Sequence, residues 1–232
     1  MMNETGLLRF NRTKPTMPFV RRLCRQLIAG RVAVFPTETQ YALGADVTSD
    51  RGVGRVREIK GRSKNQPLSI FLPDRQSLAD WEITLPDWAE SLAEAFWPGP
   101  LTLILPTRNR LFHRLGGADR TVGVRVSPEP IVHRLCHRLG HPLIATSANP
   151  SGLVLSSTAE NHWLVKQAAQ GFLLWARPAR FRRRPASTVL DCTGRRVCMV
   201  RDGAIPSRIW RQAVPASRLD RVMIHDELSV PR

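Results

Sequence analysis

The sequence predicts a single-domain α/β or α+β fold, in which helices flank a mixed β-sheet. Short apolar runs of strand length alternate with stretches of helical periodicity, which is typical of sheet proteins with covering helices. The last predicted strands follow one another closely, so we expect both parallel and antiparallel pairs. There is no repeat with a period of about 20–50 residues and no internal linker rich in Gly, Ser or Pro. We therefore expect one domain over residues 17–211, between tails at 1–16 and 212–232.

Apolar spacing and local start and stop residues predict each element in turn. The first helix begins at Pro18, carries Leu23 on its apolar face and ends at Gly30. A strand at 31–35 and a helix at 50–60, which starts after Ser49-Asp50, come next. The later expected elements are a strand at 68–72, a helix at 87–96, strands at 101–105 and 122–126, a helix at 131–139, a strand at 143–146, a helix at 158–168 opened by a Ser157/Glu160 capping box, and strands at 172–175, 188–191 and 197–201.

The charge of the chain is strongly unbalanced. Lys and Arg number 35 against 19 Asp and Glu, which gives a net charge of +16. All but four of the basic residues are arginines, whose guanidinium groups match two phosphate oxygens at once. The excess indicates a polyanionic partner such as tRNA or double-stranded RNA. A GC-rich genome that encodes its basic residues as arginine explains the same excess, and both explanations remain open.

Composition excludes several classes of protein. A hydrophobic content of 42% with 23% charged residues is that of a globular chain, which excludes wholesale disorder. No apolar run approaches the roughly 20 residues of a membrane-spanning helix, and no secretory leader is recognised, so we expect a cytoplasmic protein without membrane contact. The basic stretch 9–31 superficially suits a mitochondrial presequence, but its apolar residues belong to the predicted fold. The four cysteines are expected to be buried thiols outside any disulfide: Cys24, Cys136, Cys192 and Cys198.

Standard catalytic motifs are missing from the sequence: it contains no phosphate loop of the Walker type, no Gly-x-Gly-x-x-Gly and no His-Glu-x-x-His. His133, His137 and His141 are spaced by four residues, which invites a metal site. Arg134 and Arg138 share their helix, however, and such a cationic setting disfavours a divalent ion. We expect an exposed helix face and no metal site.

Four polar clusters interrupt otherwise apolar strand ends, where open sheets bind ligands. Pro36-Thr-Glu-Thr39 offers hydroxyls and a carboxylate to a small zwitterion, and Lys60-Gly-Arg62 places two cations where they can converge on phosphates. Thr121-Val-Gly-Val-Arg125 buries an arginine that must find an anion. Thr146-Ser-Ala-Asn149 and the turn after it suit phosphate or ribose hydroxyls. Each cluster alone also fits an ordinary turn or a solvated helix end.

In this order, the clusters resemble the YrdC-like family of threonylcarbamoyl-AMP synthases. The resemblance runs from about residue 18 to 206. The matching landmarks are Pro36-Thr-Glu-Thr39, Lys60-x-Arg62, Trp97-Pro-Gly-Pro-Leu-Thr102, Gly123-Val-Arg125, Ser147-Ala-Asn149-x-Ser-Gly152, Ser187-Thr-Val-Leu-Asp191 and Arg201-x-Gly203. The resemblance implies a twisted mixed sheet flanked by helices, with a large basic cavity.

The resemblance also implies an activity: L-threonine, bicarbonate and ATP are joined to threonylcarbamoyl-AMP with release of pyrophosphate, for the N6-threonylcarbamoyl modification of tRNA adenosine. Such a reaction needs positioning and neutralisation of phosphate charge rather than a protein nucleophile. Mg2+ is expected on the phosphates and other threonylcarbamoylation proteins are expected partners. By carry-over, Lys60 and Arg62 are the catalytic residues and hold the ATP phosphates; Thr121, Ser147, Asn149 and Arg201 also line the ATP site; Thr37, Arg125 and Ser187 bind threonine, with Arg125 pairing with its carboxylate.

Some positions depart from the family pattern. Ala42 stands where the usual pattern has glycine, and Ser63 replaces the proline after Lys-x-Arg. Phe71 occupies the position at which many members have a histidine that helps with threonine. A less-characterised branch shares Tyr41-Ala-Leu-Gly44 but has damaged Lys-x-Arg and Ser-x-Asn elements, which are intact here. The synthase is therefore favoured, in a short form without the extra C-terminal domain of longer members.

Two other functions compete with the synthase. A non-catalytic RNA-binding protein of the same fold, acting in tRNA or ribosome maturation, agrees with the charge. A phosphate-ester hydrolase is disfavoured because the sequence shows no paired carboxylates for a metal site. The densest cationic run, Arg177, Arg180, Arg182, Arg183 and Arg184, is expected to be either a contact surface for tRNA or a partner protein, or a solvated loop.

Overall fold

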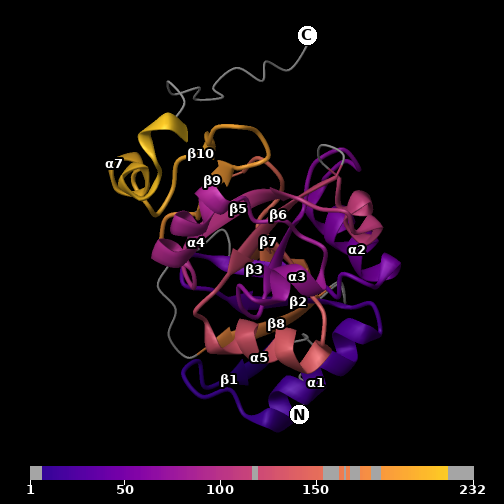
Figure 1. Ribbon diagram of the computed structural model, residues 1–232. Coiled ribbons are helices and arrows are strands. Elements are labelled where there is room, and N and C mark those ends of the chain that lie inside the picture. Colours follow the sequence, from indigo (N-terminus) through magenta and orange to yellow (C-terminus); the bar gives the residue numbers. More distant parts are fainter. Residues whose placement is uncertain are drawn as a thin grey trace.

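A single mixed sheet organises the computed structural model of the protein (Figure 1). The structure describes residues 7–116, 120–153, 162–164, 166–167, 173–178 and 184–218. Within these residues, ten strands follow the order β1-β8-β2-β3-β7-β4-β6-β5-β9-β10. None of the described helices combines the length and the apolar character that a bilayer crossing requires.

The strands are short, and all except β1 and β3, which were not predicted, lie close to their predicted places. Their bounds are β1 Leu7–Phe10, β2 Val32–Pro36, β3 Tyr41–Gly44, β4 Ser69–Leu72, β5 Leu101–Pro106, β6 Thr121–Val126, β7 Leu143–Ser147, β8 Leu173–Pro178, β9 Thr188–Asp191 and β10 Cys198–Arg201. The predicted mixed sheet is confirmed, because β2 pairs parallel with β8 and antiparallel with β3, while β6 pairs parallel with β4 and antiparallel with β5.

The helices also follow the predicted order. They are α1 Met17–Ile28, α2 Asp50–Lys60, α3 Ser77–Asp80, α4 Glu90–Phe96, α5 Pro130–Leu139 and α7 Ser207–Trp210, with 3-10 turns at Asp87–Ala89, Arg110–Leu115, Arg211–Ala213 and Ala216–Arg218. The predicted start of α2 is confirmed, since the Ser49 hydroxyl accepts a hydrogen bond from the Gly52 amide at 3.1 Å. Of the helix expected at 158–168, the structure describes helical residues 162–164 and 166–167, and the capping box lies outside the described residues.

The two faces of the sheet are covered by different helices. α1 and α5 pack on one face, where Leu23 and Leu135 meet the β2 residue Phe35. On the other face Val56 of α2 and Leu92 of α4 join a larger core. β2 shows how one strand serves both cores: Ala33 and Phe35 face the α1/α5 side, whereas Val32 and Val34 face the other.

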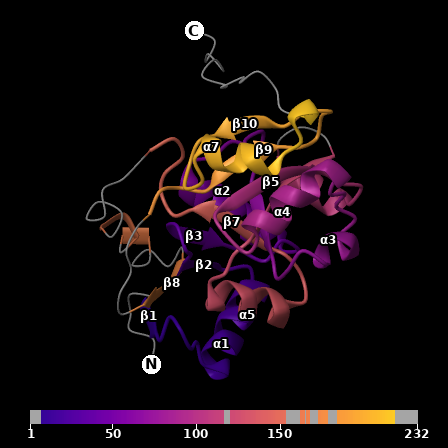
Figure 2. The same cartoon turned by 60° about the vertical axis from the view of Figure 1, so that its left-hand side comes forward.

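The chain ends differ from the tails that the sequence analysis expected. Residues 7–10 form β1, which pairs parallel with β8, and Figure 2 shows these two strands beside β2 and β3. Arg12 is held by an ion pair to Glu129, so the prediction of a loose tail is wrong for residues 7–12. At the other end Val214 is buried, and the Val197 amide donates to the Arg218 carbonyl, so the packed chain continues past residue 212.

Candidate active site

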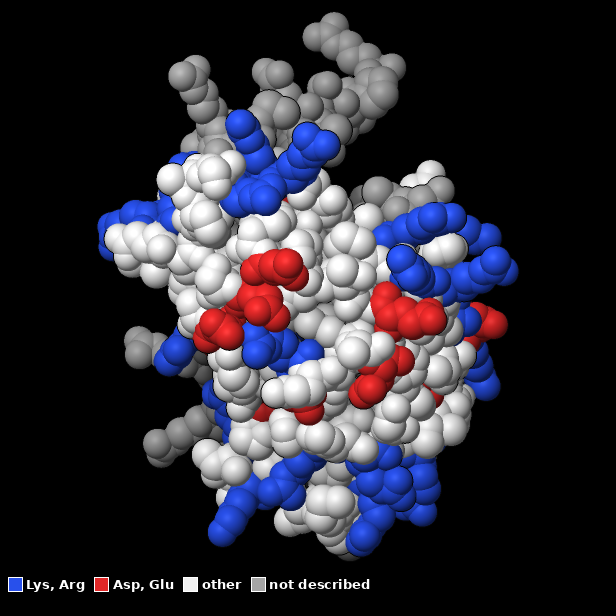
Figure 3. All heavy atoms as spheres, in the orientation of Figure 1, with Lys and Arg blue, Asp and Glu red and all other residues white. Residues whose placement is uncertain are grey.

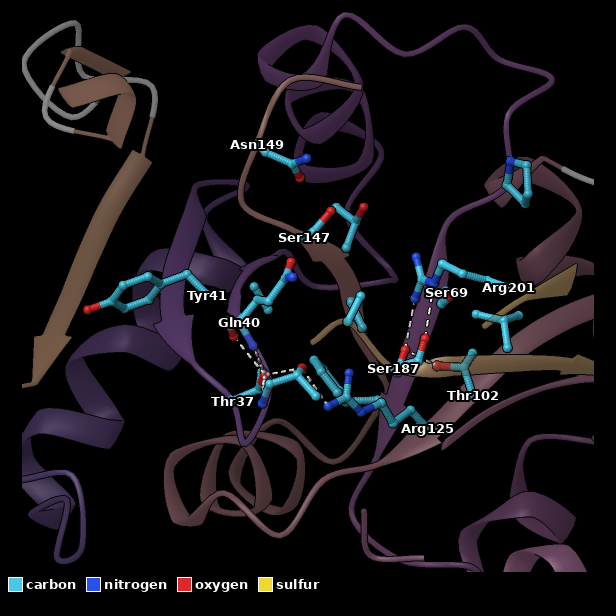
Figure 4. A pocket seen from close by; sticks show the side chains of 18 of the residues that line it. Thr37, Gln40, Tyr41, Ser69, Thr102, Arg125, Ser147, Asn149, Ser187 and Arg201 are labelled. Atoms are coloured by element: carbon cyan, nitrogen blue, oxygen red, sulfur yellow. Dashed lines mark hydrogen bonds between the residues drawn. The ribbon is translucent and has the colours of Figure 1, made fainter. Parts of the chain in front are cut away.

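A cavity of about 500 Å³ opens on the α1/α5 side of the sheet (Figure 4). Residues from most of the strands line it: Thr37, Thr39, Gln40, Tyr41, Ala42, Arg62, Pro67, Ser69, Phe71, Thr102, Arg125, Ala145, Thr146, Ser147, Asn149, Ala186, Ser187, Val189, Val200 and Arg201. No carboxylate is among these lining residues.

Strand alternation explains why the cavity is polar. In β6, Val122, Val124 and Val126 point into the larger core, so the residues between them point to the opposite face. That face carries Arg125 in β6 and Thr102 in β5, both of which line the cavity. α1 and α5 pack over β2 and β4, and the polar residues lie on the strands beyond this cover. Arg125 therefore faces the cavity although the strand that carries it is otherwise apolar.

The turn between β2 and β3 forms one wall of the cavity. The Thr37 hydroxyl donates to the Gln40 carbonyl at 2.7 Å and lies 3.0 Å from the Thr39 hydroxyl. The amides of Thr39 and Gln40 both donate back to the Thr37 oxygen at 3.2 Å (Figure 4). The Thr37 side chain, only 2% exposed, thus closes the turn internally.

Arg125 already has an anion from the protein itself. Its Nη2 donates to Glu38 Oε1 at 2.6 Å and to the Thr39 hydroxyl at 2.9 Å. The second oxygen of Glu38 accepts from the Ser127 hydroxyl at 2.6 Å. The guanidinium also lies 5.7 Å from the centre of the Phe71 ring, a cation–π distance. The sequence predicted that Arg125 needs an anion, and Glu38 supplies it in this structure.

A second ion pair supports this wall from behind. The Arg12 guanidinium donates to both carboxylate oxygens of Glu129, at 2.8 to 3.1 Å, and to the Thr37 carbonyl at 3.2 Å. Glu129 is 4% exposed, and its amide donates to the Ser127 hydroxyl that contacts Glu38. Arg12, Glu129 and Ser127 thereby connect the N-terminal segment to Glu38 in the cavity wall. The hydrogen bond to the Glu129 carboxylate raises the pKa of Arg12.

Lys60 ends α2 and lies behind the cavity wall rather than on it. Gly61 terminates the helix with φ at 59°, a conformation that favours glycine and turns the chain between the two cations. The Lys60 ammonium donates to the carbonyls of Ser147 and Asn149 at 2.6 and 2.7 Å. Burial lowers the pKa of Lys60 to about 7, and the nearby Arg62 charge acts in the same direction. Lys60 therefore fixes the 147–149 loop.

Arg62 reaches the cavity from the residue after Gly61. Its Nη1 donates to the Pro67 carbonyl at 2.9 Å, and its other contacts are the Ser151 hydroxyl at 3.4 Å and the Thr146 hydroxyl at 3.5 Å. All these acceptors are uncharged. Desolvation lowers the pKa of Arg62, and the charge of Arg57 adds to the effect.

Arg201 lies across the cavity on β10. It donates to the Ser187 carbonyl at 3.0 Å and to the Ser187 hydroxyl at 2.9 Å, and that hydroxyl lies 3.0 Å from Thr102 (Figure 4). Gly203 allows this approach, since a Cβ there would lie 2.5 Å from the Ala186 carbonyl oxygen. Desolvation lowers the pKa of Arg201, and the charges of Arg125 and Arg62 lower it further.

The cavity thus has two halves. In the paired half, Arg125 is neutralised by Glu38. In the unpaired half, Lys60, Arg62 and Arg201 contact only carbonyl, amide and hydroxyl oxygens among the described residues. Three cations without a carboxylate leave this half strongly positive, which suits a ligand with several negative charges.

The structure brings together most of the residues that the sequence singled out. Those lining the cavity are Thr37, Arg62, Arg125, Ser147, Asn149, Ser187 and Arg201. Lys60 lies directly behind Ser147 and Asn149. Thr121, at the start of β6, is not among the lining residues, although strand alternation places it on the same face as Arg125.

Several contributing residues were not singled out by sequence reasoning. Glu38 stood inside a recognised cluster but was not assigned as the partner of Arg125. Ser69 and Thr102 line the cavity from β4 and β5, and their alternation with buried apolar residues was the available signal. Among the divergent positions, Ala42 and Phe71 line the cavity, whereas the Ser63 carbonyl accepts from Arg57 at 2.6 Å.

Other sequence predictions fall away from the cavity. His133 and His137 are exposed on α5 as expected, whereas His141 lies beyond the helix, 3.2 Å from Asp46. Cys24, Cys136 and Cys192 are buried free thiols, as predicted, and Cys198 is half-buried rather than buried. Of the arginine run 177–184, only the side chain of Arg184 belongs to the described part of the structure, where it is exposed; the others lie outside.

Comparison with known proteins identifies the family of the chain. The family model described as “Telomere recombination”, which covers Sua5, YciO and YrdC proteins, matches residues 25–203. The threonylcarbamoyl-AMP synthase of Halorhodospira halophila is 38% identical over 138 residues, 59% of this chain and 72% of that protein. The protein of the same name from Pyrococcus abyssi is 39% identical over 133 residues, 57% of this chain and 39% of that protein.

Solved structures agree with this assignment. The P. abyssi Sua5 structure with L-threonine matches with a TM-score of 0.76 and 28% identity, over 92% of this chain and 62% of that one. E. coli YciO matches with a TM-score of 0.73 and 22% identity, over 85% of this chain and 95% of that one, which shows the common fold. This chain thus spans about three fifths of the Sua5 structure. Since the matched residues include both halves of the cavity, the chain belongs to the Sua5, YciO and YrdC family.

Proposed function

We propose that this protein joins L-threonine, bicarbonate and ATP to threonylcarbamoyl-AMP and pyrophosphate, for the threonylcarbamoyl modification of tRNA adenosine. The names of its curated relatives support this activity, as does the L-threonine complex of P. abyssi Sua5. The unmodified tRNA and the other modification proteins are its proposed partners, and the cytoplasm is its proposed location.

The observation that carries the proposal is the division of the cavity into a paired and an unpaired half. Threonine is a zwitterion without net charge, and a neutral Arg125–Glu38 pair can bind it without an excess of either sign. The triphosphate of ATP carries several negative charges and needs the uncompensated cations Arg62 and Arg201. Threonine, which has no net charge, therefore fits the paired half of the cavity, and the negatively charged ATP fits the unpaired half.

The chemistry needs no nucleophile from the protein. The threonine amine combines with bicarbonate to give a carbamate and water. A carbamate oxygen then attacks the α-phosphorus of ATP, and pyrophosphate leaves as the P–O bond breaks. In the proposed arrangement, Arg62 and Arg201 neutralise the phosphate oxygens while Lys60 holds the loop that carries Ser147 and Asn149. Catalysis then comes from positioning and charge neutralisation.

The roles of the threonine-site residues can be stated more narrowly. The Arg125 Nη1 makes no hydrogen bond within the described structure, whereas Nε and Nη2 are engaged, so Nη1 is the proposed donor to the threonine carboxylate. The Ser187 hydroxyl, held between Arg201 and Thr102, would stand where the two halves meet. Thr37 would act by fixing the turn that carries Glu38, because its hydroxyl serves the turn itself.

Magnesium fits this cavity only through the nucleotide. The lining residues offer no carboxylate oxygen, and Glu38 is already bound to Arg125 and Ser127. Mg2+ prefers carboxylate and phosphate oxygens and water, so phosphate oxygens would hold it here. The protein's own contribution is its guanidinium groups.

The test is pyrophosphate release by the purified protein with ATP, L-threonine and bicarbonate, leaving out each substrate in turn. The expected result is release that requires all three, and formation of threonylcarbamoyl-AMP seen by mass spectrometry. Release that persists without threonine or bicarbonate, or a product without the carbamoyl group, would overturn the proposal.

A further inference from the structure

The exposed sides of α1 and α5 form a surface with one sign of charge. We define the basic helix face as Arg21, Arg22 and Arg25 of α1 with Arg134 and Arg138 of α5. Arg21, Arg25 and Arg138 are exposed, and the other two are half-buried. None of the five forms an ion pair with a carboxylate of the described residues. Their charge therefore faces the solvent uncompensated.

The five arginines lie on adjoining helices. α1 and α5 pack against each other, and Arg134 Nη1 lies 3.7 Å from Met17 Sδ at the start of α1. Leu23 and Cys24 of α1 also share a core cluster with Leu135 and Cys136 of α5. On α1 itself, Arg21 and Arg25 are one turn apart, about 6 Å along the axis. The result is one continuous surface spanning two helices.

The chain segments that contain α1 and α5 carry no acidic residues within the helices. The sequence has no Asp or Glu between residues 5 and 37 or between 130 and 153. Asp46 and Glu129, which lie near the ends of α5, are 3% and 4% exposed and bonded to other groups. Asp74 and Asp80 line a separate pocket with His137 and His141, and the Asp74 carboxylate accepts hydrogen bonds from Ser77. In Figure 3 blue side chains cover the lower end, where Figure 1 places α1 and α5, as well as parts of the top and the right side, while red ones lie mainly across the middle.

The uneven distribution of acidic residues along the chain favours a functional surface over a mere compositional excess of arginine. An arginine-rich genome raises the arginine content everywhere, but it does not remove acidic residues from one layer. The segment 73–107 shows the contrast, with one basic residue, Arg75, and six acidic ones: Asp74, Asp80, Glu82, Asp87, Glu90 and Glu94. A surface of arginines without acidic neighbours is typical of proteins that bind phosphate backbones.

We propose that the basic helix face binds the phosphate backbone of a structured RNA. Arginine forks match phosphate oxygens, and several of them on two adjoining helices suit a ligand with repeated negative charges. The face adjoins the cavity, because Glu129, immediately before α5, contacts Arg12, which donates to the Thr37 carbonyl. An anionic membrane is a poorer ligand, since the apolar side of α1, with Leu23 and Leu27 at 0% exposure, is already packed in the core.

The test compares two triple variants with the same change of charge. Arg21→Gln/Arg25→Gln/Arg138→Gln removes charge from the basic helix face. The matched control, Arg108→Gln/Arg195→Gln/Arg208→Gln, removes three exposed arginines elsewhere. Binding of purified bulk tRNA is measured by fluorescence anisotropy over a range of KCl concentrations. In the first variant, affinity should fall about tenfold or more, and the slope of log affinity against log salt should flatten by about two to three units. The control should change little.

Three results would overturn the proposal: equal loss in both triple variants, loss in neither, or tighter binding of the wild type to phosphatidylserine vesicles than to tRNA at equal phosphate concentration. The proposal does not rest on the proposed function. Pyrophosphate release without RNA is measured on the same samples, and both variants should retain it because the cavity residues are unchanged. A protein that binds tRNA through this face but forms no adenylate would refute the enzyme assignment alone.

Discussion

The two halves of the cavity hold their positive charge in different ways. In the paired half, Arg125 and Glu38 neutralise each other, and Ser127 and Thr39 complete the network. In the unpaired half, Arg62 and Arg201 have only neutral acceptors among the described residues, and desolvation lowers their pKa values. An ion pair is electrostatically stable without a ligand. Partly desolvated cations without a carboxylate partner are stabilised most when a polyanion binds.

The difference teaches how one cavity could discriminate between the two proposed substrates. Residue types alone do not distinguish the halves, since arginine and hydroxyl side chains occur in both. The presence or absence of one carboxylate does. Glu38 neutralises Arg125, so the proposed ligand of this half is a neutral, dipolar molecule rather than an anion, and no described carboxylate pairs with Arg62.

Removing Arg125 should have the largest effect. Arg125→Leu leaves the Glu38 carboxylate, whose side chain is 15% exposed, without its cation, at a cost of about 3 kcal/mol in the free energy of unfolding. For a chain of this size the melting temperature should fall by about 6–12 °C. Threonine binding should be lost, while ATP binding, measured by calorimetry, persists.

The double variant Arg125→Leu/Glu38→Leu separates stability from binding. Removing both charges should recover much of the lost stability, because no buried charge remains unpaired. Threonine binding should stay lost. If threonine still binds Arg125→Leu with unchanged affinity, the paired half is not the threonine site.

Removing Arg62 should have a smaller and more selective effect. Arg62→Ala deletes a charge-assisted phosphate contact worth about 1.5–3 kcal/mol, so ATP affinity should fall about tenfold or more. The melting temperature should barely change, since Arg62 has no charged partner to leave behind. The control is Arg55→Ala, which removes a half-buried arginine of α2 that does not line the cavity. This variant should bind ATP normally. Equal ATP affinity in both variants would contradict the phosphate role.

Arg12 tests the support behind the paired half. Arg12→Gln removes the ion pair to Glu129 and weakens the contact with the Thr37 carbonyl, at a cost of about 1.5 kcal/mol. We expect KM for threonine to rise several-fold while KM for ATP and kcat stay near their original values. Arg12→Lys, which keeps the charge but loses the fork, should fall between the two. A change confined to the ATP parameters would refute this connection.

The pKa of Lys60 predicts an effect of a different kind, on the pH dependence of stability. Burial lowers this pKa to about 7, below the 10.5 of an exposed lysine, so between these values the unfolded chain binds more protons than the folded one. The contribution of Lys60 to stability should therefore rise with pH above about 7, by at most about 1.4 kcal/mol per pH unit. Melting curves of the wild type and Lys60→Met between pH 7 and 10 should diverge in favour of the wild type. Parallel curves would mean that Lys60 does not titrate there.

Local patterns predicted most elements, while long-range partners were harder to predict. The helices and strands around Val56, Leu92 and Leu135 follow from apolar periodicity, and the structure confirms them. β1 was missed because its short run gains its partner only from β8, far along the chain. Parallel pairing between distant segments leaves no local signal.

The same limit applies to the candidate site. The sequence indicated that Arg125 requires an anion, yet Glu38 lies 87 residues away, and no spacing rule connects the two. The Lys60-Gly-Arg62 motif predicted two convergent cations. In the structure the αL turn at Gly61 sends Arg62 into the cavity and Lys60 to the loop carbonyls behind it. The chemical character of these side chains was predictable from residue type. The directions in which they point depend on the backbone conformation, which the sequence did not reveal.

The position of β8 between β1 and β2 also constrains how the chain is made. A strand from late in the sequence fills the gap between two strands from the beginning, so β1 has no neighbour until the ribosome has synthesised β8. At typical bacterial or eukaryotic elongation rates this delay is on the order of ten seconds or more. During it, the N-terminal segment and the free edge of β2 are exposed to chaperones, proteases and other nascent chains. Cotranslational protection of these first strands is thus a requirement built into the order of the sheet.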